Sequence, residues 1–394
     1  MIEAIRSTIG RIVSTGHVRW SEFAWPVLLI AAGLLAAGMT FVSVMADSAS
    51  NPELGGVDYE GHRQKLLVAL PVFFAGLFLR PSWLKRNAAL IYSACVVLLV
   101  LVPIIGDERN NARRWIQLPK FDLQPSELAK IGVILMLARV LHENPLKTAR
   151  DWLKPMLVTA VPMLLVAAQP DLGTALTLVP VLGGLLYLAG GSGQALGALG
   201  LAAIAAGFGV WQSGHVQSYQ LERIDTWVES FDDRELIASR NGLGFHTYHA
   251  RTFTGNGGLY GRGLGEGVAN ETGLLPERDS DSIIAVIGEE WGFAGTAMVI
   301  VLYGLMVGLL MLHAAGLRDR FSRLVVGGVA IYFAAHLFIN VSVNLGLLPM
   351  TGLTLPLFST GGSSLLATFL ALGLALGLSS HHERNLGGDA FRRY

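Results

Sequence analysis

The sequence is poor in cysteine and in charged residues. Cys95 is the one cysteine in 394 residues, which excludes an intramolecular disulfide and a metal site built from clustered cysteines. Asp, Glu, Lys and Arg make up 15% of the chain, whereas soluble domains carry roughly 25%. The 29 basic and 29 acidic residues balance to a formal net charge of zero, which argues against a nucleic-acid partner. The low charge content is that of a membrane protein.

Several common catalytic motifs are also missing. The chain contains no GxxxxGK[ST], HExxH or GxSxG motif, and no GxGxxG that opens a helix. Residues 1–20 carry Arg6, Arg11 and Arg19 without a signal-peptidase site of the A-x-A type. We therefore expect a cytoplasmic N-terminal segment over 1–20 rather than a cleaved secretory signal.

Apolar residues are abundant: they form 52% of the chain, and the mean hydropathy is +0.51. A helix that crosses the bilayer core needs roughly 20 of them. Runs that meet this requirement begin near Phe23, Leu66, Ala88, Leu128, Pro155, Thr174, Gln194, Ile283, Leu324 and Leu355. We predict an all-α integral membrane protein of about ten transmembrane helices, forming a single domain over 1–394.

The basic connections predict the orientation, because short basic loops stay in the cytoplasm. Ten spans place "RPSWLKRN", "RDRFSR" and the tail, 381–394, on one side, so both termini are expected in the cytoplasm. The longest polar stretch, 212–282, then becomes a large extracytoplasmic loop between the seventh and eighth helices. The basic segment "RNNARRW", 109–115, also falls outside, against the rule, which suggests an anionic ligand.

Three polar segments stand at the outer ends of the predicted helices. In the first, Arg113 and Arg114 could bind phosphate oxygens or lipid headgroups. Glu127 and Lys130 are three residues apart and can pair on one helix face, an ion pair that could simply fix the helix end. In the second, "QPDLGT", Asp171 could cap the next helix or form the floor of a site.

The third segment, 338–366, contains Pro349, Pro356 and two glycines at membrane depth. Irregular backbone is tolerated there only when it is buried in protein or lines a cavity. Asn340 and Ser363 could hydrogen-bond a ligand or satisfy the broken backbone. We interpret the segment as a re-entrant wall of a cavity.

The stretch "LPERDSDSIIAVIGEEWG", 275–292, carries five acidic residues. Asp281 lies at the predicted water–membrane boundary, where partial burial and nearby acids raise the pKa of a carboxylate and suit it to act as a general base. A helix N-cap is the equally simple alternative. Glu289 or Glu290 could be buried against a cation such as Lys130 or Arg262.

Together these blocks resemble the SEDS family (shape, elongation, division, sporulation), the RodA and FtsW proteins. The resemblance runs from about Gly106 to the last span. It rests on "ARRWIQL…QPSELAK", "QPDLGTAL", "SYQLERI", "GNGGLYGRGLGEG", "LPERDSDSIIAVIGEEWGFAG" and "NLGLLPMTGLTLPLFSTGGSSLL". It implies ten transmembrane helices with a large loop between the seventh and eighth.

The resemblance also implies an activity. Family members are peptidoglycan glycosyltransferases that polymerise lipid II at the outer face of the bacterial cytoplasmic (inner) membrane, with a class B penicillin-binding protein as partner. By this resemblance Asp281 is the catalytic carboxylate, Glu127 and Lys130 are the family's paired residues, and Trp115 is its essential tryptophan. Features of both the elongation branch ("LPER") and the division branch ("TGLTLPL") are present, so the branch stays open.

The chain departs from the family pattern at three positions. Ser282 stands where Phe is usual, Asp279 where His is common, and Thr360 where the pattern has Tyr. Asp279 is therefore a second candidate for the base, and the two acids could share a proton. The departures also keep a non-catalytic scaffold open as an alternative.

The implied chemistry needs one base and several cations. Pyrophosphate is already a good leaving group, so the general acid of glycoside hydrolases is not required. Arg113 and Arg114, together with Arg223 or Arg262, are expected to hold the pyrophosphate. No metal-binding motif is present; a divalent cation, Mg²⁺ or Mn²⁺, held through Asp171 or Asp281 is compatible with the family's chemistry. A lipid-linked precursor flippase is the main alternative function, because broken helices and buried polar groups also suit a transporter.

Overall fold

A computed structural model describes residues 20–48, 57–109, 112–118, 121–212 and 218–380. Nearly all of the predicted cytoplasmic segment 1–20, and the whole tail 381–394, lie outside the described residues. The chain is mostly helical, and a helix overlaps each predicted apolar run. The long helices are α2 (Trp25–Ser48), α3 (Tyr59–Phe78), α4 (Pro81–Ile105), α5 (Pro125–Leu141), α6 (Ala149–Ala168), α7 (Leu172–Leu188), α8 (Gly193–Gln212), α13 (Ile283–Gly316), α14 (Arg320–Asn344) and α15 (Gly362–Ser380).

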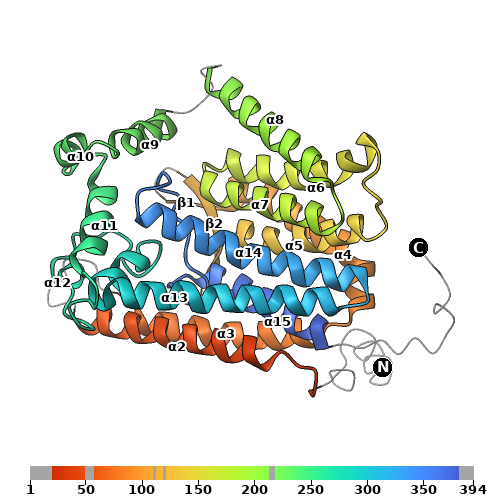
Figure 1. The fold of residues 1–394 in the computed structure, drawn as a ribbon, viewed down its shortest axis with the longest axis horizontal. Coiled ribbons are helices and arrows are strands. Elements are labelled where there is room, and N and C mark those ends of the chain that lie inside the picture. Colours follow the sequence, from red (N-terminus) through yellow and green to blue (C-terminus); the bar gives the residue numbers. More distant parts are fainter. Residues whose placement is uncertain (1–19, 49–56, 110–111, 119–120, 213–217, 381–394) are drawn as a thin grey trace.

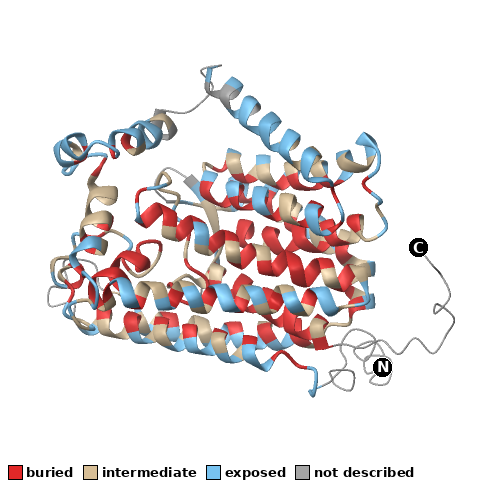
Figure 2. Cartoon of the chain, in the orientation of Figure 1, coloured by how far each residue is buried: buried red, intermediate tan, exposed pale blue. Residues whose placement is uncertain are grey.

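Within the described part of the chain, six helices are long and apolar enough to cross a membrane: α2, α4, α6, α13, α14 and α15. The long helices lie side by side in one bundle, and α8 lies at its edge (Figure 1). Helices α14 and α15 are buried over most of their length, whereas the outer helices expose apolar side chains such as Leu90, Ile204 and Leu312 (Figure 2). An apolar outer surface is what contact with lipid requires. The chain is a multi-pass membrane protein.

Local sequence signals explain several helix ends. Pro81 and Pro125 occupy the first positions of α4 and α5, where a missing amide hydrogen leaves no bond unmade. Asp319 precedes α14 and accepts a 2.8 Å hydrogen bond from the amide of Ser322, which satisfies a free donor of the first turn.

Helices α3 and α15 approach each other closely because two glycines face α3. A Cβ atom on Gly373 would lie 2.2 Å from the carbonyl oxygen of Phe73, and one on Gly377 would lie 2.3 Å from that of Leu77. Small residues at such crossings let two backbones pack in contact inside a membrane. This packing holds the second half of α15 against the end of α3.

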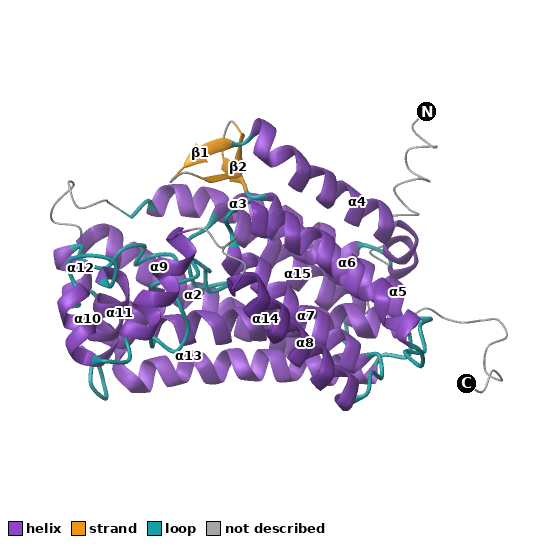
Figure 3. Ribbon diagram, turned by 90° about the horizontal axis from the view of Figure 1, so that it is seen from above, coloured by secondary structure: helices purple, strands orange, loops and turns teal. Residues whose placement is uncertain are grey.

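The prediction of an all-α fold is wrong in one segment. Strands β1 (Asp107–Arg109), β2 (Ala112–Leu118) and β3 (Phe121–Leu123) form a small antiparallel sheet in the order β1-β2-β3. The search for runs of about 20 apolar residues cannot detect strands of three to seven residues. The sheet covers the end of α4 and the start of α5 (Figure 3).

The polar stretch between α8 and α13 is also helical. Its elements are α9 (Ser218–Glu229), α10 (Asp233–Ser239), α11 (Phe245–Asn256) and α12 (Val268–Thr272). Helices α10, α11 and α12 gather at one end of the bundle in two perpendicular views (Figures 1 and 3). The stretch therefore has regular secondary structure over much of its described length.

Helix α13 is interrupted at Gly292, whose φ of 66° and ψ of −164° are not helical. The glycine-rich loop after α11 fills the interruption. The amides of Phe293 and Ala294 donate to carbonyls of that loop at 2.9 and 3.0 Å, and in return the loop amides of Arg262 and Gly263 donate to α13 carbonyls at 3.0 Å. These four bonds pair backbone groups of α13 on both sides of the break, where the regular helical pattern is interrupted.

Candidate active site

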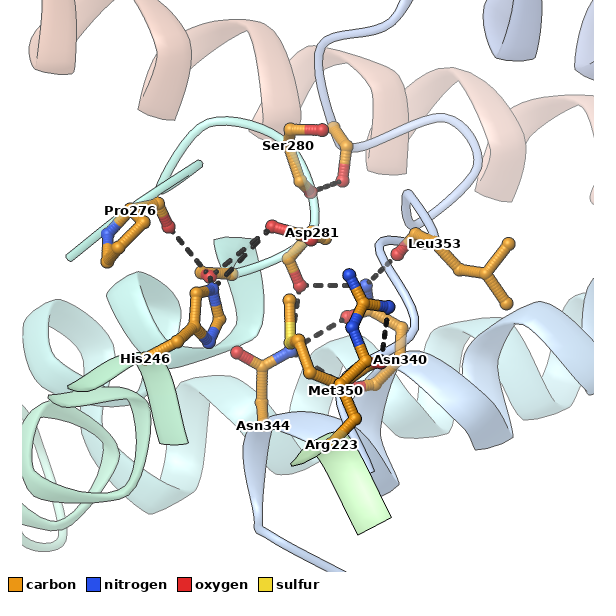
Figure 4. A network of polar contacts seen from close by, with 11 residues as sticks. Arg223, His246, Pro276, Ser280, Asp281, Asn340, Asn344, Met350 and Leu353 are labelled. Atoms are coloured by element: carbon orange, nitrogen blue, oxygen red, sulfur yellow. Dashed lines mark hydrogen bonds and ion pairs between the residues drawn. The ribbon is translucent and has the colours of Figure 1, made fainter. Parts of the chain in front are cut away.

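The short loop before α13 carries Asp279, Ser280 and Asp281, and its backbone is held by α14 and by the segment between α14 and α15. The side-chain amides of Asn340 and Asn344 donate to the backbone carbonyl oxygen of Asp281 at 3.0 and 2.9 Å (Figure 4). These two residues are four apart on α14 and therefore lie on one face of it. They act here through the backbone of the loop, which fixes the position of Asp281.

The remaining loop carbonyls are bound in the same way. The hydroxyl of Ser359 donates to the carbonyl of Ser280 at 2.5 Å, and the amide of Thr360 donates to the carbonyl of Asp279 at 2.7 Å. Three successive carbonyls thus accept hydrogen bonds from two other elements. Such a loop presents its side chains in one fixed arrangement.

The carboxylate of Asp281 is almost completely buried, with 6% of the residue exposed. Its Oδ1 lies 3.5 Å from the hydroxyl of Ser282 and 4.0 Å from Nε2 of His246. Burial, and then the negative charge of Glu277, raise the pKa of Asp281 to about 7. A carboxylate with a pKa near the working pH is suited to accept a proton in a reaction.

His246, on α11, was not predicted as a site residue. Its Nε2 lies 2.9 Å from the hydroxyl of Ser282, and that hydroxyl is 3.0 Å from the carbonyl oxygen of Pro276. The carbonyl oxygen of Pro276 can only accept a hydrogen bond. When the Ser282 hydroxyl donates to it, that hydroxyl accepts a hydrogen bond from Nε2–H of His246. Burial, and then the charge of Arg223, lower the pKa of His246 to about 4, which keeps the ring neutral. The only signal in the sequence was the unusual Ser282.

Asp279 differs from Asp281 in its surroundings. It is half-buried, and its Oδ2 accepts a 2.6 Å hydrogen bond from the hydroxyl of Thr360. Both residues are departures from the family pattern, and they contact each other. Asp281 has no such close hydroxyl donor, since the nearest, that of Ser282, is 3.5 Å away.

Glu127 and Lys130 form the ion pair that their spacing predicted. The ammonium of Lys130 lies 2.7 Å from Oε1 of Glu127 and 3.0 Å from Nε2 of His336, and all three residues are buried. The other ring nitrogen of His336 lies 3.2 Å from the carbonyl of Thr354. The pair is thereby connected to the irregular segment between α14 and α15.

Arg113 and Arg114 point to different surroundings. The guanidinium of Arg114 donates to the carbonyls of Gln169, at 2.9 Å, and Pro170, so it holds the turn before Asp171. Arg113 is half-exposed and pairs with Glu108 at 3.2 Å. Of the two, Arg113 has the more accessible guanidinium. Trp115 is half-buried on the same strand, opposite Asp107.

Asp171 and Ser363 belong to a second polar cluster beside this turn. Asp171 caps α7 by accepting from the amide of Thr174 at 3.1 Å, and its other oxygen accepts from the side chain of Gln124 at 3.1 Å. The hydroxyl of Ser363 accepts from the amide of Gln124 and donates to the carbonyl of Asp122, both at 2.7 Å. The capping alternative for Asp171 is thus observed, and Ser363 links α15 to the start of α5.

Arg262 lies in a third cluster, at the break in α13. Its Nε is 3.8 Å from Oε1 of Glu289, whose carboxylate also accepts from the amides of Val268 and Ala269 at 3.0 and 2.9 Å. The side chain of Asn270 donates to Glu290. The two glutamates therefore hold α12 against α13, and Arg262 pairs with one of them.

An apolar groove of about 510 Å³ lies on the outer surface of α7, α13 and α14. Its lining includes Leu176, one turn beyond the start of α7, and Ile339, which precedes Asn340. The groove thus begins next to the polar clusters and continues along the bundle. Its apolar lining suits a hydrocarbon chain.

The described residues contain no group of three or more His, Cys, Asp or Glu placed to bind one metal ion. Mg²⁺ usually takes one or two protein carboxylates and completes its octahedral shell with water and substrate oxygens. Asp171 and Asp281 belong to different clusters, each with its own hydrogen bonds. Within the described residues, these two carboxylates are therefore not placed together around one ion.

The fold and site define a polytopic helical membrane protein with a buried carboxylate of raised pKa at one end of its bundle. A family model for cell cycle proteins, the FtsW, RodA and SpoVE family, matches residues 24–384. The chain belongs to this family.

Individual relatives agree with this membership. The chain is 34% identical over 373 residues to a probable peptidoglycan glycosyltransferase FtsW of Trichlorobacter lovleyi, covering 92% of this chain and 94% of that protein. It is 30% identical over 362 residues to the peptidoglycan glycosyltransferase MrdB of Escherichia coli K12, covering 91% and 94%.

Solved structures share the fold. A chain of a peptidoglycan synthase complex that coordinates polymerization and crosslinking superimposes with a TM-score of 0.75 at 30% identity, covering 91% of this chain and 98% of that one. The rod shape determining protein RodA of Thermus thermophilus gives a TM-score of 0.66 at 30% identity, covering 91% and 97%.

Proposed function

We propose that this protein is a peptidoglycan glycosyltransferase that polymerises lipid II into glycan strands at the outer face of the bacterial cytoplasmic membrane. The observation that carries the proposal is the carboxylate of Asp281, buried on a fixed loop with a pKa of about 7. The relatives named as peptidoglycan glycosyltransferases support the same activity.

In this proposal Asp281 is the general base. It removes the proton from the acceptor sugar hydroxyl while that oxygen attacks the anomeric carbon of the donor. The bond from that carbon to undecaprenyl pyrophosphate breaks, and the anomeric centre is inverted. The leaving pyrophosphate needs no proton, since it is a good leaving group, so one base is sufficient.

The negative charge of the pyrophosphate requires cations. Arg113 has the accessible guanidinium and is proposed to contact the pyrophosphate directly. Arg114 is proposed to act by holding the Asp171 turn, because two carbonyls already engage it. Lys130 and Glu127 support the wall beneath the site through His336. Trp115, Asn340, Ser363 and Arg262 are proposed to shape the walls through the contacts described above.

The groove on α7, α13 and α14 is proposed to bind the isoprenoid tail of the substrate. Its lining is apolar, and it starts near Asp171 and Asn340. A lipid-linked donor could therefore keep its tail in contact with the membrane while its pyrophosphate reaches the polar clusters. No step is assigned to a metal ion.

The proposed topology has ten transmembrane helices, which are α2 to α8 and α13 to α15, in a single domain. An even number of crossings, with basic connections inside, places both termini in the cytoplasm and α9 to α12 outside. The loop that carries α9 to α12 is then the large extracytoplasmic loop, and Asp281 lies at the outer face. This orientation matches the location of the substrate.

A class B penicillin-binding protein is the proposed partner. The resemblance to RodA and FtsW proteins implies it, and a related chain has been solved within a peptidoglycan synthase complex. Glycan polymerisation and crosslinking would then be carried out by one assembly.

The test is polymerisation of purified lipid II by the full-length protein with a class B partner, comparing the native chain with Asp281→Asn. We expect polymer from the native chain and none from the variant, which should be folded and at least as thermally stable as the native chain. Polymer from a folded Asp281→Asn protein would refute the assignment of the base. If the native chain forms no polymer but moves lipid II across vesicles, the glycosyltransferase proposal is wrong.

A further inference from the structure

The end of the bundle opposite the candidate active site contains a polar hollow of about 450 Å³. It lies between the start of α4, the end of α5 and the start of α14. Four of its lining residues are basic or imidazole side chains, namely Lys85, Arg86, Arg139 and His142. The volume is within the usual range for small-molecule sites, roughly 300–1,000 Å³.

Two of the cations of this hollow, both on α4, have no partner among the residues that the structure describes. Neither Lys85 nor Arg86 makes a side-chain hydrogen bond or ion pair with another residue that the structure describes. Arg139 donates one of its five N–H groups to the carbonyl of Arg86 at 2.8 Å. That bond ties α5 to α4 and holds the guanidinium of Arg139 in the wall of the hollow.

The two acidic residues of the hollow contact groups other than Lys85 and Arg86. Oε1 of Glu143 lies 2.9 Å from Nε2 of His142. Oδ2 of Asp319 accepts from the amide and the hydroxyl of Ser322 at 2.8 and 2.6 Å. The cations on α4 are therefore available to an added anion.

The position of the hollow follows from the helix directions. Helix α5 begins near the candidate site and ends at the hollow after 17 residues, a rise of about 25 Å. Helix α14 begins at the hollow and reaches Asn344 after 25 residues, about 37 Å away. In Figure 1 the start of α13 and α12 lie at the left and the start of α14 lies at the right. The hollow is thus at the depth of the opposite membrane surface, which the proposed topology makes cytoplasmic.

We propose that this hollow is a binding site for an anionic phosphate group, carried by a phospholipid headgroup or present as free phosphate. Arg86 and Arg139 supply planar guanidinium groups that can bind two phosphate oxygens each, and Lys85 adds a flexible ammonium. Basic pockets between transmembrane helices are known to hold anionic headgroups. The site is separate from the substrate site, and its occupancy would anchor α4, α5 and α14 relative to one another.

The test uses the purified full-length protein in a neutral detergent, with its thermal unfolding midpoint as the readout. Three probes are titrated: short-chain phosphatidylglycerol, short-chain phosphatidylcholine and inorganic phosphate. The variant Lys85→Gln/Arg86→Gln removes the two unpaired cations. The control, Arg150→Gln/Lys154→Gln, removes two exposed cations near the start of α6, which is at the same end but does not line the hollow.

We expect phosphatidylglycerol to raise the midpoint saturably. The hollow variant should bind it at least about tenfold more weakly, because it loses two charged donors to the phosphate oxygens. The control should bind as the native chain does, and the unliganded midpoints should agree. Saturation by inorganic phosphate with the same dependence on Lys85 and Arg86 would support the site and identify free phosphate as its ligand.

Two results would overturn the proposal. The first is equal weakening in the control and the hollow variant, which would indicate general attraction to basic surface. The second is that the binding of all three probes is the same before and after Lys85 and Arg86 are replaced.

Discussion

The hydroxyl of Thr360 donates a 2.6 Å hydrogen bond to the carboxylate of Asp279. The two residues are 81 positions apart in the sequence, and each replaces the residue that the family usually has. Through this contact the carboxylate of Asp279 is hydrogen-bonded to the segment between α14 and α15. It distinguishes Asp279 from Asp281, whose carboxylate is more buried and less engaged.

Asp279→Asn should therefore keep most of its polymerising activity, within about tenfold of the native chain. An amide can still accept the Thr360 hydrogen bond, and a neutral hydrogen bond of this kind contributes about 1 kcal/mol. The measurement is glycan polymer from lipid II at fixed enzyme concentration. An inactive but folded Asp279→Asn protein would move the role of base to Asp279 or to the pair.

The rate of polymerisation should fall as the pH drops through about 7, because the base acts only when it is deprotonated and the pKa of Asp281 is about 7. Glu277→Gln removes the charge that helps to raise this pKa. The pH at which the polymerisation rate falls should then move lower, by up to about one unit. Glu271→Gln, at an exposed position of α12, is the control and should leave the pH dependence of the rate unchanged. An unchanged pH dependence in Glu277→Gln would contradict the effect of the Glu277 charge on the pKa of Asp281.

Asp281→Asn should be more stable than the native chain at pH 8. The pKa of Asp281 is raised from an ordinary 3.8 to about 7, so between these values the folded protein binds a proton that the unfolded chain has lost. Native stability therefore falls as pH rises from about 4 to 7, by on the order of 4 kcal/mol, and the variant lacks this loss. Thermal unfolding midpoints across pH 4 to 8 measure it. If the difference in thermal unfolding midpoint between the variant and the native chain is the same at every pH, stability does not depend on the titration of Asp281.

Breaking the Glu127–Lys130 pair should destabilise the protein strongly. Both residues are buried, and Glu127→Leu alone removes the carboxylate that balances the charge of Lys130, leaving the ammonium beside His336 and the Tyr332 ring, at a loss of about 3–5 kcal/mol. Adding Lys130→Met should recover part of that stability, because the uncompensated charge is gone. A thermal double-mutant cycle measures the coupling. Equal and additive losses would show that the pair is not coupled.

Gly292→Ala should destabilise α13 and the loop that fills its break. The added Cβ would lie 2.3 Å from the backbone nitrogen of Gly261, and the φ of 66° disfavours any residue with a side chain. Gly304→Ala lies on the same helix with nothing within 4 Å of its Cβ, and it should be neutral or stabilising by about 0.5–1 kcal/mol. The thermal midpoints of both variants test this pair. A neutral Gly292→Ala would mean that the break can close.

The sequence by itself determined the apolar helices and the spacing that lets Glu127 and Lys130 pair, and it indicated the cap as one of two roles for Asp171. These features depend on local spacing: 20 apolar residues span a bilayer, and residues three apart share a helix face. The resemblance to one family also came from sequence blocks, and the family match confirmed it.

Only the tertiary structure decided which polar groups meet. His246 reaches Ser282 from 36 positions away, Thr360 reaches Asp279 from 81 positions away, and Asn340 and Asn344 bind the loop that carries Asp281. The small sheet and the loop inserted at Gly292 were likewise invisible in hydropathy. Buried polar groups must find partners wherever the packed helices bring them, and that choice is made by the whole bundle rather than by neighbours in the chain.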